Sequence, residues 1–164
     1  MMAEDNLIEV SMGNMHTGCA PARLITRALG SCLGITFYHP AKKIGAMAHP
    51  MLPDIDKARM KSNPYRFVNS VIKKGIEDLE KLGCPKTSLV VKLFGGAHMF
   101  SFITVDSILN VGEKNIEMAR IVLNELGLKI TAEEVGGTFG RTIELNLENG
   151  KVFVDTVSWG RKEV

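Results

Sequence analysis

The sequence predicts an α+β fold, in which two main helices pack on a system of largely antiparallel strands. Three observations support this prediction. Short β-rich segments follow one another through tight turns, which is typical of hairpins. Only two stretches carry apolar residues at the three- and four-residue spacing of a helix. Strands and helices do not alternate regularly, as they would in a doubly wound fold.

The first third of the chain is expected to contain strands and loops. Residues 7–12 alternate apolar and polar side chains and predict a strand, 13–22 read as a loop, and 23–26 predict a short strand. Residues 33–38 and 44–48 are β-rich and flank a turn with a proline, so they predict a hairpin.

The two helices are predicted from their spacing and end signals. A polar loop over 51–62 precedes Asn63, a residue suited to cap a helix, and Pro64, which suits the first helical position. Gly83 should end this first helix. The second helix is expected over about 113–126. The apolar residues that define the two faces are Phe67, Val68, Val71, Ile72, Ile76 and Leu79, then Ile116, Ala119, Val122, Leu123 and Leu126.

Four further strands are expected in the rest of the chain. They lie at about 88–94, 128–134, 141–147 and 151–157. Asn149-Gly150 between the last two is a strong hairpin turn. The chain thus holds about seven or eight expected strands.

Length and charge narrow the class of protein. The 164 residues predict a single domain over 1–164, and a net charge of +2 is too small to favour nucleic acid. No apolar run reaches the ~20 residues of a membrane helix, and the polar start has no secretory signal pattern. We therefore expect a cytoplasmic protein with no membrane insertion, whose three cysteines are free thiols.

Cys32 and His49 form the most reactive pair that the sequence offers. Cys32 lies in the turn Leu29-Gly30-Ser31-Cys32, and His49 ends the next apolar segment, a spacing that suits two adjacent strands. An imidazole can take the proton of a thiol and so activate it as a nucleophile. The turn, through Gly30 and Ser31, could direct amide N–H groups at a developing oxyanion. The alternative is a small buried cysteine and an ordinary core histidine.

A zinc site is the competing interpretation of the same residues. His16 and Cys19 have the close spacing of a ligand pair, and Cys32 with His49 could complete a two-Cys, two-His site. The second pair lacks the short spacing of known zinc sites, so we expect no metal and no cofactor.

Two Gly-rich loops are candidates for the rim of a site. They contain Gly95-Gly96 and Gly136-Gly137, and neither matches a phosphate-binding pattern. Glycine lets a backbone approach a substrate closely, and it also forms ordinary tight turns. Arg141, after the second loop, could face a partner or an internal carboxylate.

Five ordered motifs together resemble the CheD chemoreceptor glutamine deamidases. They cover almost the whole chain, in the order found in that family. The motifs are Thr26-x-x-Leu29-Gly30-Ser31-Cys32, Ile44-Gly45-Ala46-Met47-Ala48-His49-x-Met51-Leu52-Pro53, Lys92-Leu93-Phe94-Gly95-Gly96-Ala97-x-Met99, Val111-Gly112-x-x-Asn115 and Gly136-Gly137-x-x-Gly140-Arg141.

The resemblance implies a function and a set of catalytic residues. It implies a cysteine hydrolase that converts selected glutamines of methyl-accepting chemotaxis receptors to glutamate and releases ammonia. The family triad of Cys, His and Thr maps onto Cys32, His49 and Thr26. The family fold that the resemblance implies is a layered α/β sandwich, similar to the catalytic domain of deamidating bacterial toxins. Some members bind the phosphatase CheC, so a non-catalytic adaptor that regulates CheC is the alternative function.

Overall fold

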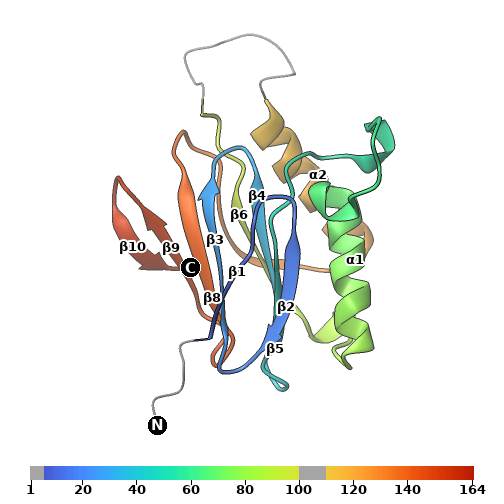
Figure 1. The fold of residues 1–164 in the computed structure, drawn as a ribbon, viewed down its shortest axis with the longest axis vertical. Helices are drawn as coiled ribbons and strands as arrows, with labels where there is room; N and C mark the ends of the chain where they lie inside the picture. The colour runs from blue at the N-terminus through green and yellow to red at the C-terminus, as the bar shows by residue number, and fades with distance from the viewer. Residues whose placement is uncertain (1–5, 100–109) are drawn as a thin grey trace.

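The computed structural model describes residues 6–99 and 110–164 and has three layers. Two α-helices lie on one side, a five-stranded sheet forms the middle, and a second five-stranded sheet forms the other side (Figure 1). Six of the strand pairs are antiparallel and two are parallel. The predicted α+β sandwich of largely antiparallel strands is therefore confirmed.

The outer sheet has the strand order β1-β3-β8-β9-β10, and the middle sheet has the order β2-β5-β4-β6-β7. The strands of the outer sheet are β1 (Leu7–Glu9), β3 (Arg23–Leu29), β8 (Arg141–Asn146), β9 (Val152–Thr156) and β10 (Gly160–Glu163). Those of the middle sheet are β2 (Met15–Cys19), β5 (Ile44–Ala48), β4 (Leu33–His39), β6 (Val90–Gly95) and β7 (Ile130–Val135).

Two apolar cores hold the layers together. Helices α1 (Val68–Lys81) and α2 (Val111–Glu125) bury one face each against the middle sheet, where Phe37, Ile72 and Leu93 are fully buried. The second core lies between the two sheets and includes Leu24, Met47 and Phe94. Removing so much apolar surface from water is the main force that stabilises this arrangement.

The hairpin over 33–48 is confirmed, with β4 and β5 paired antiparallel from Ile35 opposite Ala48 to His39 opposite Ile44. The turn at Asn149-Gly150 is confirmed as well, with Gly150 at φ 76° between β8 and β9. In both cases the local turn chemistry agrees with the tertiary pairing.

Strands β2 and β10 are not predicted by the sequence, and the expectation of a loop over 13–22 is wrong. The segment 13–22 contains β2, which pairs with β5 along the edge of the middle sheet. Its residues His16, Thr17 and Gly18 show no alternation of apolar and polar side chains. An edge strand with one covered face needs few apolar side chains. The C-terminal strand β10 is exposed throughout and forms by pairing with β9.

The first helix begins later than predicted. Asn63 does cap a helical turn, since its side chain accepts a hydrogen bond from Tyr65 N at 3.1 Å, but this turn is a 3₁₀ helix over Pro64–Arg66. The α-helix starts at Val68 because Phe67 is extended and pairs with Leu52. Short 3₁₀ helices also cover Ile55–Lys57 and Lys86–Ser88.

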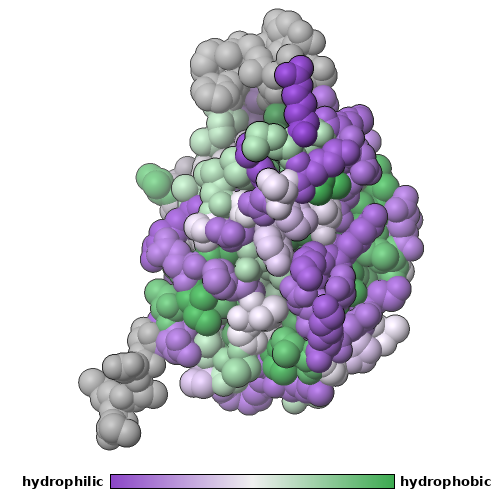
Figure 2. Space-filling view, turned by 45° about the vertical axis from the view of Figure 1, so that its right-hand side comes forward, coloured by the Kyte–Doolittle hydropathy of each residue, from purple (hydrophilic) through white to green (hydrophobic). Residues whose placement is uncertain are grey.

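The helical side of the molecule is mostly hydrophilic at its surface. Figure 2 turns this side forward and shows hydrophilic residues with separate hydrophobic groups between them. Ion pairs on α1, such as Lys74 with Asp78 at 3.1 Å, are partly exposed to solvent. No helix in the described part of the chain is both long and apolar enough to cross a bilayer.

Candidate functional site

Cys32 and His49 lie at the ends of two neighbouring strands. Cys32 immediately precedes β4, and His49 immediately follows β5. The pairing of these strands continues past their ends, because Leu33 N donates a hydrogen bond to Pro50 O at 3.1 Å. The predicted proximity of the two segments in adjacent strands is thus present in the structure.

Both side chains belong to the layer between the two sheets. Met47, two residues before His49, packs in the inter-sheet core, whereas Ala46 and Ala48 pack under the helices. Side chains alternate across a strand, so His49 continues the face of Met47. Cys32 belongs to the same inter-sheet core.

Thr26 reaches this layer from the opposite sheet, on the same face of β3 as Leu24, and a bulge in β3 follows it. The register of β3 with β8 shifts between Thr26 and Leu29, and Ala28 within the bulge has φ 59°. In a regular strand, residues three apart face opposite sides. The bulge lets Thr26 and Leu29 both be fully buried, which explains their spacing in the motif.

A hydrogen bond joins Thr26 to His49. Thr26 Oγ1 lies 2.6 Å from His49 Nδ1 and 2.6 Å from Val10 O. A hydroxyl has one proton, and the carbonyl of Val10 can only accept. Thr26 Oγ1 therefore donates to Val10 O and accepts from Nδ1–H of His49. This assigns the tautomer of the neutral ring and leaves the Nε2 lone pair free.

His49 Nε2 is buried and makes no hydrogen bond to any residue that the structure describes. His49 as a whole is 1% exposed and Cys32 is 8% exposed. Burial lowers the pKa of His49 to about 4. Burial also raises the pKa of the Cys32 thiol, and the Cys32 amide offsets part of this shift. Both groups are therefore neutral at pH 7 in the free protein.

The buried imidazole should make the fold sensitive to acid. The pKa of His49 falls from 6.5 in the unfolded chain to about 4 in the folded one, so the unfolded state binds the proton more tightly. Stability is then fully present above about pH 6.5 and is lost as the pH falls toward 4, by about 3 kcal/mol in total. Urea unfolding at about pH 7.5 and about pH 5 should show a loss about 2 kcal/mol larger in the wild type than in His49→Asn. Equal losses in both proteins would contradict the assignment.

The turn Gly30-Ser31-Cys32 is held by its three carbonyl groups. Gly30 O accepts from Ala97 N at 2.8 Å, and Cys32 O accepts from Gly96 N at 2.9 Å. Ser31 O accepts from the side-chain Nδ2 of Asn115 at 2.9 Å. The N–H groups of Ser31 and Cys32 donate to no backbone carbonyl in the described residues. Within this part of the chain no backbone carbonyl uses either amide, and the Cys32 amide lies beside its own thiol.

Gly95 is required for this close packing. Its φ is 90°, and a Cβ added there would lie 2.4 Å from Cys32 O. No side chain fits at that distance, so the backbone of β6 reaches the turn Gly30-Ser31-Cys32 only because this residue is glycine.

The two Gly-rich loops meet beside the turn. Gly136 N donates to Gly95 O at 2.9 Å, and His98 N donates to Gly137 O at 2.8 Å. Gly96, Gly136 and Gly137 line one pocket of about 210 Å³ together with His98. The structure therefore brings the predicted rim glycines together, while their contact with a substrate stays a prediction.

Arg141 faces an internal carboxylate. It is 2% exposed, forms an ion pair with Glu134, and stacks over Phe139 with 4.4 Å between the guanidinium carbon and the ring centre. Of the two partners left open by the sequence, the carboxylate is the one seen for the guanidinium. A role of Arg141 at the rim stays a prediction, and the pairing of Arg141 with Leu29 places its backbone in the outer sheet.

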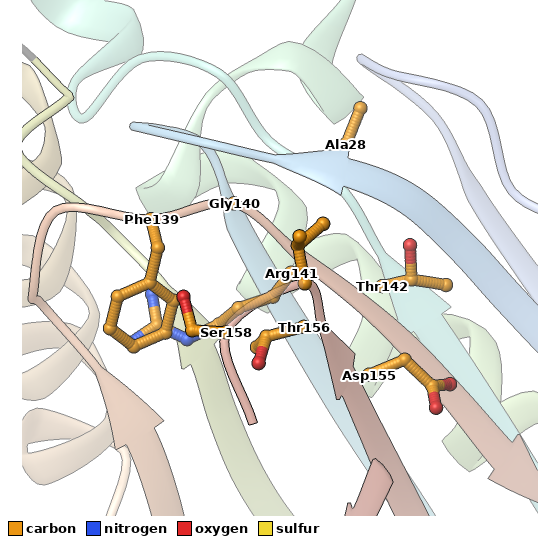
Figure 3. A pocket seen from close by; sticks show the side chains of 9 residues that line it. Ala28, Phe139, Gly140, Arg141, Thr142, Asp155, Thr156 and Ser158 are labelled. Carbon is orange, nitrogen blue, oxygen red and sulfur yellow. The ribbon is translucent and has the colours of Figure 1, made fainter. Parts of the chain in front are cut away.

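A larger pocket of about 430 Å³ lies beside the bulge, on the solvent side of the outer sheet. Figure 3 shows Phe139 at one end, Asp155 at the other, and Thr156 and Ser158 between them. Cys32, His49 and Thr26 do not line it. The three candidate catalytic residues therefore lie outside this pocket.

The zinc interpretation finds no support in the arrangement of its residues. Across 6–99 and 110–164 there is no group of three or more His, Cys, Asp or Glu side chains that could hold a metal ion. His16 lies on the edge strand β2, opposite Met47. Cys19, Cys32 and Cys84 are free cysteines.

Comparisons with known proteins cover most of the chain. Residues 51–156 match the family described as CheD chemotactic sensory transduction. The chain belongs to the CheD family. The matched part includes α1, α2 and both Gly-rich loops, and the segment with Thr26, Cys32 and His49 precedes it.

Relatives of the CheD family extend the match to nearly the whole chain. A Clostridium botulinum protein named probable chemoreceptor glutamine deamidase CheD is 38% identical over 157 residues, 96% of this chain and 97% of that protein. A Desulforamulus reducens protein of the same name is 37% identical over 150 residues, 92% of this chain and 90% of that protein. The Bacillus licheniformis hypothetical protein YfiH aligns in structure over 80% of this chain and 60% of its own, with a TM-score of 0.45 and 14% identity.

Proposed function

We propose that this CheD protein is a glutamine deamidase that acts on chemoreceptors through Cys32, His49 and Thr26. The observation that carries the proposal is the hydrogen bond from His49 Nδ1–H to Thr26 Oγ1, because it leaves a buried Nε2 lone pair in the same layer as Cys32. The names of the two bacterial relatives supply the substrate class.

In the proposed first step, His49 Nε2 takes the thiol proton as Cys32 Sγ bonds to the carboxamide carbon of a glutamine. A neutral thiol and a neutral imidazole are suited to this order of events, because the proton moves only when the substrate is present. Apo structures commonly have loose catalytic hydrogen bonds that tighten when substrate binds. The unoccupied Nε2 is consistent with such a state.

The tetrahedral intermediate carries a negative oxygen that needs hydrogen-bond donors. The N–H groups of Ser31 and Cys32 donate to no backbone carbonyl of the described residues and are suited to this role. Donors of this kind contribute strongly to acyl-transfer catalysis. The proton on Nε2 then passes to the departing nitrogen, the C–N bond breaks, and ammonia leaves. Water, deprotonated by Nε2, attacks the thioester, and the C–S bond breaks to give glutamate and the restored thiol.

The Thr26 hydroxyl can be tested without changing the size of the side chain. Thr26→Val removes the acceptor for Nδ1–H, so we expect kcat to fall about 100-fold as the imidazole loses its orientation. The buried groups left unpaired should also lower the free energy of unfolding by about 1–3 kcal/mol. Thr26→Ser retains the hydroxyl and should keep most of the activity. Equal activity of the Val and Ser variants would remove Thr26 from the mechanism.

The function itself is tested with purified chemoreceptors. The protein is incubated with the cytoplasmic part of a receptor, and glutamine peptides are followed by mass spectrometry for the conversion of a carboxamide to a carboxylate. We expect conversion at selected glutamines together with release of ammonia. Receptors that keep every glutamine, under conditions where the protein binds them, would favour the adaptor alternative.

A further inference from the structure

Asn115 donates hydrogen bonds to both halves of the proposed site. It lies on the first turns of α2 and is fully buried. Its Nδ2 donates to Ser31 O at 2.9 Å and to Met51 O at 3.1 Å. Ser31 directly precedes Cys32, and Met51 follows His49 by two residues. A single amide group therefore ties the nucleophile turn to the segment that carries the base.

The bond to Ser31 O also fixes the direction of the next amide. The Ser31–Cys32 peptide is planar and trans, so its C=O and N–H groups point in opposite directions. With the carbonyl held by Asn115, the N–H of Cys32 must point away from α2. Burial raises the pKa of the Cys32 thiol, and a hydrogen bond from this same amide offsets part of that increase. The amide therefore lies beside Sγ.

The antiparallel pairing of β4 with β5, which begins at Ile35 opposite Ala48, also sets the relative position of Cys32 and His49. The bond from Leu33 N to Pro50 O joins the two strand ends, and the bonds from Gly96 and Ala97 hold only the Cys32 side. A helix side chain that donates to both segments prevents the turn from moving independently of the base.

We propose that Asn115 is a positioning residue that holds the Cys32 turn and the His49 segment in one relative position and directs the Cys32 amide at the reacting oxygen. This inference rests on the proposed function, since the reacting oxygen is that of the glutamine carboxamide. Asn115 acts through Cys32 and His49 and does not itself need to touch the substrate.

The test uses two replacements of Asn115 in the full chain. Asn115→Ala removes the donor, and Asn115→Asp keeps the shape but places an acceptor beside two carbonyl oxygens. We expect kcat for receptor deamidation to fall about 100-fold in both, because small misplacements of reacting groups have effects of this size. KM should change by less than about threefold, since the substrate-binding surface is intact.

A second measurement reports on position without using the receptor. Alkylation of Cys32 by iodoacetamide, followed as a function of pH by mass spectrometry of the Cys32 peptide, gives the pKa of the thiol. We expect this pKa to rise in both Asn115 variants, with about a tenfold slower alkylation at neutral pH. A residue that only stabilised the fold would leave the profile of the folded protein unchanged.

Asn69 offers a matched control. It is also a buried asparagine, and it donates from Nδ2 to Asp54 Oδ1 at 2.9 Å and accepts from Ile55 N at 3.0 Å. Asn69→Ala should reduce thermal stability and leave both kcat and the Cys32 profile unchanged. Equal loss of kcat in Asn69→Ala and Asn115→Ala would overturn the proposal, as would wild-type kcat and alkylation in the two Asn115 variants.

The experiments distinguish a failure of the proposed deamidase function from a failure of the positioning role of Asn115. A wild-type protein that deamidates no receptor would count against the proposed function, whereas the alkylation profiles would still test the role of Asn115. Should Asn115→Ala not fold, Asn115→Asp and its circular dichroism spectrum provide the same comparison. A folded Asn115→Asp protein with wild-type alkylation contradicts the positioning role.

Discussion

Cys32→Ala is expected to abolish deamidation while leaving the fold intact. The proposed nucleophile is gone, so no thioester can form, and the rate should fall on the order of 10⁴-fold or more. The remaining side chain is smaller by one sulfur atom at the edge of the inter-sheet core, where Cys32 is 8% exposed. The melting temperature should therefore change little. Ammonia release and circular dichroism measure the two effects separately.

The other two cysteines are matched controls for this experiment. Cys84 is fully buried in the core under the helices, and Cys19 is exposed on β2. Cys84→Ala should lower stability moderately and keep kcat, and Cys19→Ser should change neither. A Cys32→Ala protein with wild-type activity would remove the thiol mechanism altogether.

His49→Asn should cause a similarly large loss of activity for a different reason. The amide nitrogen of asparagine can take the place of Nδ1 and donate to Thr26 Oγ1, so the hydrogen bond recorded at 2.6 Å can be kept. What is lost is Nε2, the only basic atom proposed to move protons in both steps. We expect kcat to fall on the order of 10³-fold or more.

His39→Asn is the control that separates the effect of His49→Asn from a general effect of losing a histidine. His39 is also buried, at the opposite end of β4, and its Nδ1 accepts from Lys42 N at 3.1 Å. His39→Asn should keep the wild-type rate. Alkylation of Cys32 should slow only in His49→Asn, and retained deamidation in that variant would exclude His49 as the base.

The fold was predictable wherever local signals agreed with tertiary pairing. The hairpin of β4 and β5 and the helix α2 have strong periodicity and clear turn residues, and both were found close to the predicted bounds. Strand β2 was missed because pairing with β5, and not its own composition, forms it. The late start of α1 has the same cause, since Phe67 pairs with Leu52 instead of entering the helix.

The site was predictable only in part. Cys32 and His49 follow from nucleophile chemistry and adjacent strands, but Thr26 came only from the resemblance to CheD proteins. Its contact with His49 crosses between the two sheets, and no spacing rule within one segment encodes a contact of that kind. The position of Asn115 beside the apolar face of a helix was also a signal, because a buried asparagine needs hydrogen-bond partners. In the structure these partners are Ser31 O and Met51 O.

The central claim is that Cys32 forms a covalent bond to the substrate glutamine. It is tested most directly by mixing the protein with a receptor fragment, quenching with acid during turnover, and sequencing the cross-linked peptides by mass spectrometry. We expect a thioester between Cys32 and the side-chain carbonyl of a receptor glutamine, and we expect no such thioester in Cys32→Ala. Steady deamidation with an unmodified Cys32 at every quench time, and undiminished deamidation by Cys32→Ala, would contradict it.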